Sequence, residues 1–90
     1  MLVLPCELTH RQATACLAKL LQGLKALREA EVVVDATGLT AFDSSALAVL
    51  LACRREALAR GKSFSVLGLP AALRGMAGLY GVGTLLTAQG

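Results

Sequence analysis

Three adjacent polar residues, Asp43, Ser44 and Ser45, are the group in this sequence best placed to do chemistry. They stand between Phe42 and an apolar run that begins at Ala46. Asp and Ser oxygens accept hydrogen bonds from the free amides of a helix's first turn, so this group can supply an N-cap. A helix N-terminus also favours a phosphoryl group, which makes a serine here a candidate phosphoacceptor. The residue types alone leave both a cap and a switch open.

Other candidates for catalytic chemistry are few. The nucleophiles to consider are Cys6, Cys16 and Cys53, and His10 is the single histidine. Cys16 and Cys53 stand among apolar residues and are predicted to be small buried hydrophobes. Cys6 and His10 are close in sequence but have no acid–base framework around them, so we expect His10 to be a solvated first-turn residue and the chain not to be an enzyme. The three cysteines are odd in number and widely spaced, which fits a reducing cytoplasm, and one histidine with no Cys-X-X-Cys pair argues against a metal site. No cofactor is expected.

Asp35 follows three valines at the end of a predicted strand, as the phosphoacceptor of a receiver domain does. Receivers also need an acidic pair after their first strand. The corresponding segment here carries the single acid Glu7. We therefore predict that Asp35 caps a loop.

The composition favours a single domain that binds other proteins. The chain has 90 residues, of which 56% are hydrophobic and 17% charged. Surplus apolar surface on so small a domain usually marks an interface. The longest unbroken apolar run, residues 46–53, is far shorter than the roughly 20 residues of a membrane span, and the start of the chain lacks the basic leader of a signal peptide. The net charge of +3 is scattered and base-stacking aromatics are lacking, which argues against nucleic-acid binding.

The first third of the chain predicts a strand and a helix. Residues 2–4 are apolar and are stopped by Pro5. Thr9 and Gln12 have the spacing of a capping box, and leucines follow at helical intervals. We expect a helix near residues 10–29.

The middle of the chain continues the alternation of strand and helix. Three consecutive β-branched residues, 32–34, predict a strand buried on both faces. A helix follows Asp43 and ends before Gly61, a residue suited to the position after a helix C-cap. Residues 63–69 predict a third strand, and Pro70 suits the first position of the next helix.

A last helix and a short extended piece complete the predicted order β-α-β-α-β-α. The helix should end at Gly81 and Gly83, with residues 84–87 extended after it. Alternation of this kind predicts an α/β fold with a mostly parallel sheet. The side chains of this helix that we expect to point inward are Leu73, Met76, Ala77 and Tyr80.

The segment "VVVDATGLTAFDSSALAVLL", residues 32–51, resembles the central signature of STAS domains. The family has a strand ending in Asp, a loop, and then Asp-Ser-Ser or Asp-Thr opening a helix. "LVLPCELTHRQA" and "LGLPAALRGMAGLYGVGTLL" also resemble the family, so the resemblance covers nearly the whole chain. It implies a STAS fold, with a small, mostly parallel β-sheet packed by about three to four helices. The family's usual first edge strand has no counterpart here, so we expect the sheet to lack it.

Two branches of the family suggest two functions. Anti-sigma factor antagonists carry a phosphorylatable serine at the position of Ser44, and phosphorylation by a partner kinase prevents binding. The MlaB-like STAS subunits of Mla-type phospholipid ABC transporters have Thr or Ser there and hold the transporter's ATPase. This chain has Ala46 where many members have Gly, which narrows the approach of a partner's backbone. The short chain, the basic segment "CRREALARGK" and the apolar content favour the transporter branch, because obligate interfaces are the more hydrophobic kind.

The resemblance to MlaB-like subunits therefore implies a non-catalytic cytoplasmic protein that reaches the inner membrane only through its partner. That partner is the ATPase of an ABC transporter that moves phospholipids, in complex with its permease. No nucleic acid and no direct membrane insertion are expected, and the alternative partner is an anti-sigma factor kinase. The residues expected to bind the partner are Phe42, Asp43, Ser44, Ser45, Leu47 and Ala48, with Ser44 as the candidate phosphoacceptor.

Overall fold

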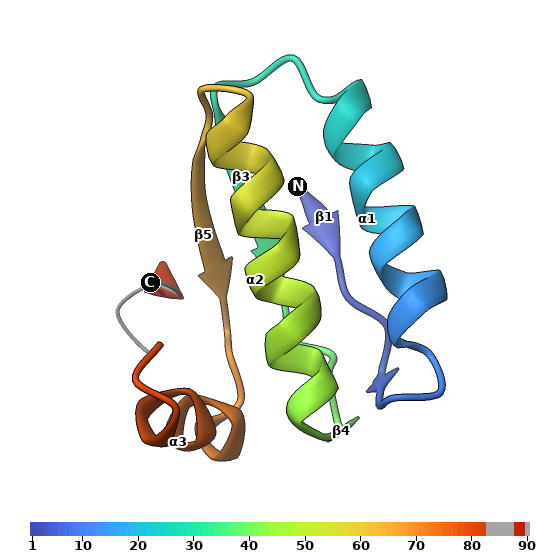
Figure 1. The fold of residues 1–90 in the computed structure, drawn as a ribbon, viewed down its shortest axis with the longest axis vertical. Helices are drawn as coiled ribbons and strands as arrows, with labels where there is room; N and C mark the ends of the chain where they lie inside the picture. The colour runs from blue at the N-terminus through green and yellow to red at the C-terminus, as the bar shows by residue number, and fades with distance from the viewer. Residues whose placement is uncertain (83–87, 90) are drawn as a thin grey trace.

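The structure is a computed structural model that describes residues 1–82, 88 and 89, with helices and short strands in alternation (Figure 1). The helices are α1 (Ala13–Ala26), α2 (Ser44–Ala59) and α3 (Ala71–Leu79). The strands are β1 (Leu2–Val3), β2 (Glu7–Leu8), β3 (Glu31–Asp35), β4 (Ala41–Phe42), β5 (Ser63–Leu67) and β6 (Ala88–Gln89).

The larger sheet confirms the predicted parallel α/β architecture. Its strands follow the order β1-β3-β5-β6, and each neighbouring pair is parallel. The register places Val34 of β3 between Leu2 of β1 and Val66 of β5. Strand β1 is therefore at one edge of this sheet. The extended piece predicted over 84–87 lies outside the described residues.

Helices α1 and α2 lie side by side over one face of this sheet (Figure 1). Val32, Val34 and Val66 point toward them and are fully buried. Alternate side chains of a strand point to opposite faces, and Val33 on the other face is only half-buried. The prediction that residues 32–34 are buried on both faces is wrong, because α1 and α2 cover the same face.

A second, two-stranded sheet was not predicted. Strands β2 and β4 pair in parallel, with Glu7 opposite Ala41 and Leu8 opposite Phe42. The Cys6 carbonyl accepts hydrogen bonds from the amides of Thr40 (2.8 Å) and Ala41 (3.0 Å) just before this ladder. Two residues are too few to show a period in the sequence. The pairing brings the segment before α1 beside the segment before α2.

The N-terminus of α1 departs from the predicted capping box. The Gln12 side chain folds back, and its Oε1 accepts hydrogen bonds from the Thr9 amide (2.9 Å) and hydroxyl (2.6 Å). The Thr9 hydroxyl in turn accepts a long bond from the Arg11 amide (3.4 Å) instead of one from Gln12. Only half of the box forms, and the helix begins at Ala13 rather than near residue 10.

The C-terminus of α1 also comes earlier than predicted, at Ala26 rather than near residue 29. Leu27 is extended, with ψ of 132°. The Lys62 ammonium donates hydrogen bonds to the carbonyls of Leu27 (3.2 Å) and Glu29 (2.6 Å). A contact from a distant loop thus satisfies carbonyls of the segment beyond the helix, which no local pattern could indicate.

Both later helices end at the glycines predicted to end them. After α2, Gly61 has φ of 74° and its amide donates to the Leu58 carbonyl (3.0 Å), while the Lys62 amide donates to the Ala57 carbonyl (2.9 Å). This pair of bonds is a Schellman motif, which needs the left-handed conformation that glycine adopts easily. Gly81, with φ of 72°, ends α3 in the same way.

The predictions for α3 need two corrections. Pro70 is the N-cap residue rather than the first helical residue. Tyr80 was expected to point inward but is 62% exposed, because it lies past the last helical residue at the C-cap. Gly83 lies outside the described residues. The other side chains predicted to point inward are buried (Leu73, Ala77) or half-buried (Met76).

The loop after β3 is held by Asp35, as predicted. Its Oδ1 accepts hydrogen bonds from the Thr37 amide (2.9 Å) and hydroxyl (2.6 Å). These bonds stabilise the carboxylate and lower the pKa of Asp35. Gly68, with φ of 67°, follows the neighbouring strand β5 and lies against Thr37. A Cβ at position 68 would meet the Thr37 side chain and would lie 3.3 Å from its Cα.

Candidate functional site

Helix α2 begins after Asp43, as the sequence predicts, and Asp43 is its N-cap residue. Asp43 is extended, with φ of −136°, and its Oδ1 accepts the Ser45 amide at 2.8 Å. Ser44 is the first helical residue and is exposed. Among the described residues its hydroxyl makes no hydrogen bond. The acidic residue is therefore the cap, and the adjacent serine hydroxyl is left accessible.

A contact between Asp43 and His10 was not predicted. The second carboxylate oxygen, Oδ2, accepts the His10 amide at 3.1 Å and lies 3.3 Å from the His10 Nδ1. His10 is a solvated residue, as expected, with 76% of its side chain exposed. It nevertheless joins the turn before α1 to the cap of α2, because the pairing of β2 with β4 places the two segments side by side. The residues are 33 positions apart, so no local motif indicates the contact.

Hydrogen bonds set the charge of the Asp43 carboxyl. The His10 amide is the largest cause that lowers the pKa of Asp43, and the Ser45 amide is the next. The carboxylate therefore keeps its negative charge at a helix N-terminus, where the helix dipole also favours it.

A shallow groove adjoins this site between α1 and α2, with a volume of about 190 Å³. Small side chains on both helices leave it open. The sequence analysis did not predict that α1 lines this groove, because its Ala and Thr residues indicate only a propensity to form a helix. The groove is lined by Ala13, Thr14 and Leu17 from α1 and by Ser45, Ala48 and Val49 from α2.

The structure places five of the six predicted partner-binding residues at or near the surface. Ser44 and Ala48 are exposed, and Phe42, Asp43 and Ser45 are half-buried. Leu47 does not belong to this surface. It is 3% exposed and packs in the core, because at helical spacing it shares the inward face of α2 with Leu50. A role for Leu47 in direct partner contact is therefore not compatible with this fold.

The cysteines behave as predicted from their neighbours. Cys16 and Cys53 are free and buried, and Cys6 is exposed. Burial raises the pKa of the Cys16 thiol, and it raises that of Cys53 to about 11, so neither is a ready nucleophile. Among the residues that the structure describes, no three side chains of His, Cys, Asp or Glu lie close enough together to hold a metal ion.

The cap and the loop predict a fall in stability with acid. The folded-state pKa values of Asp35 and Asp43 lie below the unfolded value of 3.8. Their contribution is therefore complete above that value and is lost as the pH falls through the folded-state values. We expect the midpoint of thermal unfolding to drop as the pH falls below about 4, and Asp43→Asn, which keeps a capping oxygen, to reduce that drop. If the unfolding midpoint of the variant and of the native protein changed identically with pH, Asp43 would contribute nothing to the loss of stability in acid.

The described part of the chain contains no helix that is both long enough and apolar enough to cross a membrane.

Comparison with known proteins identifies the family. A search of curated proteins finds no match. The sequence does match the protein family described as "Mlab, STAS domain" over residues 1–87. The helices, the small parallel sheet and the capped start of α2 are those expected of a STAS fold. Since the match spans nearly all of the 90 residues, the chain belongs to the family of MlaB-like STAS domains.

Proposed function

We propose that this domain is a non-catalytic subunit that binds the ATPase of an ABC transporter and regulates or stabilises it. The transporter moves phospholipids and so maintains the lipid asymmetry of the outer membrane. The domain works in the cytoplasm and reaches the inner membrane through this partner. Membership of the MlaB-like family supports this assignment over a general STAS role.

The observation that carries the proposal is the surface at the start of α2. Ser44 and Ala48 are exposed there, and the groove between α1 and α2 continues the surface with further small side chains. Small residues let a partner helix approach closely. The hydrogen bonds of Asp43 to His10 and Ser45 hold both helix starts in place before binding, which reduces the ordering cost of association.

The interface sets the activity of the transporter by mass action. A subunit that binds the assembled ATPase dimer better than its monomer shifts the equilibrium toward the dimer. Hydrolysis of ATP, and with it lipid movement, then depends on occupancy of the α2 surface.

The test is reconstitution with the ATPase and permease encoded by the same cells. We expect the tagged domain to copurify with both proteins at a fixed ratio, and its removal to change ATP hydrolysis by the complex. An ATPase–permease complex that assembles and hydrolyses ATP identically with and without the domain would contradict the proposal.

A second candidate is an anti-sigma factor antagonist switched by phosphorylation of Ser44. The exposed Ser44 hydroxyl, without a hydrogen bond in the described residues and at a helix N-terminus, favours it. Incubation with an anti-sigma factor kinase and ATP should then add one phosphate to Ser44 and abolish binding to that kinase. Stable binding to the kinase that is insensitive to phosphorylation, or no binding, would exclude this candidate.

A further inference from the structure

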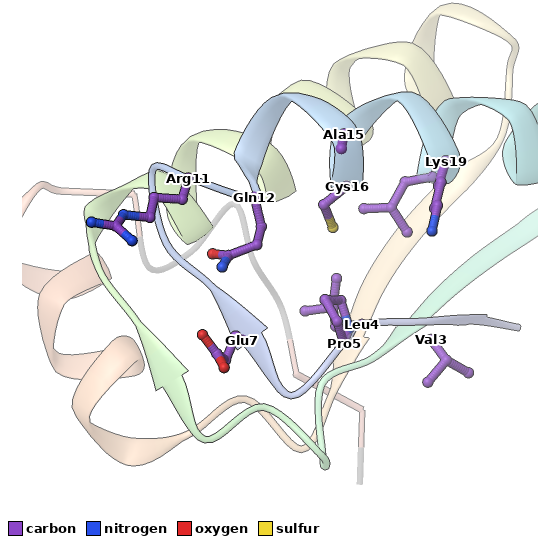
Figure 2. A pocket seen from close by; sticks show the side chains of 10 residues that line it. Val3, Leu4, Pro5, Glu7, Arg11, Gln12, Ala15, Cys16 and Lys19 are labelled. Atoms are coloured by element: carbon purple, nitrogen blue, oxygen red, sulfur yellow. The ribbon is translucent and has the colours of Figure 1, made fainter.

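A pocket of about 450 Å³ opens on the side of α1 that faces β1 and β2 (Figure 2). It shares no lining residue with the groove beside Ser45. Its volume falls in the range of about 300–1,000 Å³ typical of small-molecule sites. The two sides come from the segment after β1, with Leu4 and Pro5, and from α1, with Ala15 and Cys16.

The middle of the pocket is apolar and its two ends are polar (Figure 2). Leu4 and Cys16 are buried on opposite sides of the pocket, and Cys16 points toward Leu4 and Pro5. Lys19 lies at one end, and Glu7 and Arg11 lie at the other. An elongated ligand with an apolar body would fit between them.

The charges at the two ends differ. Glu7 and Arg11 line the same end and carry opposite charges, so that end has no net charge. Lys19 takes part in no ion pair within residues 1–82, and no acidic side chain lies beside it among the residues that line the pocket. Its ammonium is close enough to the Cys16 thiol to oppose the rise in pKa that burial causes there. The Lys19 end therefore offers one uncompensated positive charge at the mouth of an apolar cavity.

From this arrangement we infer that the pocket binds a single-chain fatty acid of medium length. The carboxylate pairs with the Lys19 ammonium, and the alkyl chain lies along Leu4, Pro5, Ala15 and Cys16. One ammonium matches one negative charge, which selects a carboxylate over a doubly charged head. The opposite end limits the chain length, because further methylene groups would have to desolvate Glu7 and Arg11.

The site is independent of the partner surface on α2. A ligand here contacts the α1 side chains that point away from the groove, and it bridges α1 to the edge of the sheet. Binding therefore stabilises the fold by mass action whether or not the transporter assignment holds.

The experiment is a calorimetric titration of the full chain with sodium hexanoate, octanoate, decanoate and dodecanoate. We expect one site, with affinity rising about three- to four-fold per methylene group and then levelling off once the chain fills the pocket. Decyltrimethylammonium, which has the opposite charge and one more methylene group in its alkyl chain, should still bind much more weakly than decanoate. Amide chemical shifts should move at residues 15–19 and not in α3.

Matched variants locate the site. Ala15→Phe, at an exposed helix position, should fill the pocket and abolish decanoate binding while helical circular dichroism stays unchanged. Lys19→Gln should weaken decanoate about three-fold, and the loss should shrink in high salt. Lys25→Gln, on the same helix but outside the pocket, is the control and should bind as the native chain does.

Any of the following results would overturn the inference. One is the absence of saturable decanoate binding. Another is equal affinity for decanoate and decyltrimethylammonium, or equal effects of Lys19→Gln and Lys25→Gln. The third is a dimer that Ala15→Phe dissociates, since a second copy would then occupy the pocket.

Discussion

Ser44→Arg should abolish copurification with the ATPase, with a loss of affinity of about 100-fold or more. Ser44 is exposed at the first position of α2, beside a groove that small side chains keep open. An arginine there overfills the contact and places a cation at the positive end of the helix dipole. The second effect costs the isolated domain only about 0.3–1 kcal/mol, so the variant should still fold. The measurement is the yield of the complex on affinity purification, with circular dichroism of the variant alone.

Two further variants make this result specific. Ser44→Ala removes the hydroxyl without adding bulk, so the transporter complex should survive it, whereas a phosphorylation switch would be lost. Ala59→Arg puts the same side chain on an exposed position at the other end of α2, where the dipole favours it. Native yield for both arginine variants would place the interface away from the start of α2.

Gly68→Ala should lower the free energy of unfolding by about 2–4 kcal/mol. The position has φ of 67°, and an added Cβ would also push against Thr37. Thr37 cannot move freely, because its amide and hydroxyl both bind Asp35. For a domain of this size the midpoint of thermal unfolding should fall by about 4–8 °C per kcal/mol.

Substitutions at two other glycines separate the cost of a positive φ from the cost of the clash with Thr37. Gly61 has φ of 74° but open space around its Cβ position, so Gly61→Ala should cost only the conformational part, about 1–2 kcal/mol. Gly38 has neither a positive φ nor a neighbour within 4 Å, and Gly38→Ala should be neutral or slightly stabilising. Equal effects at positions 61 and 68 would show that Thr37 accommodates the methyl group without loss.

The features that the sequence predicted correctly are those with local causes. The Asp43 cap follows from the hydrogen-bonding capacity of one side chain next to an apolar run. Gly61 and Gly81 end helices because few other residues adopt a positive φ. The parallel sheet follows from alternating β-branched and leucine-rich segments. Each of these signals lies within a few residues of the structure that it determines.

The features that could not be predicted from the sequence depend on contacts between distant segments. Helix α1 ends early where Lys62 binds the carbonyls beyond it. Val33 is half-buried because of where two helices pack, not because of its own type. The contact of His10 with Asp43 needs strands β2 and β4, whose two-residue length gives no pattern. The α2 part of the candidate surface could thus be predicted from sequence, but the groove residues of α1 could not.

The two-stranded sheet should be a late step in the folding of this chain. The bond between the Thr40 hydroxyl and the Cys6 carbonyl closes a loop of 34 residues, and a ladder of two residues cannot repay the entropy of that closure alone. The pairing must therefore form late, after α1 and β3 have brought its halves together, and mutations in it should chiefly accelerate unfolding. The surface that joins His10 to Asp43 then exists only in completely folded molecules. If the proposed partner docks there, it should bind only completely folded copies of the chain.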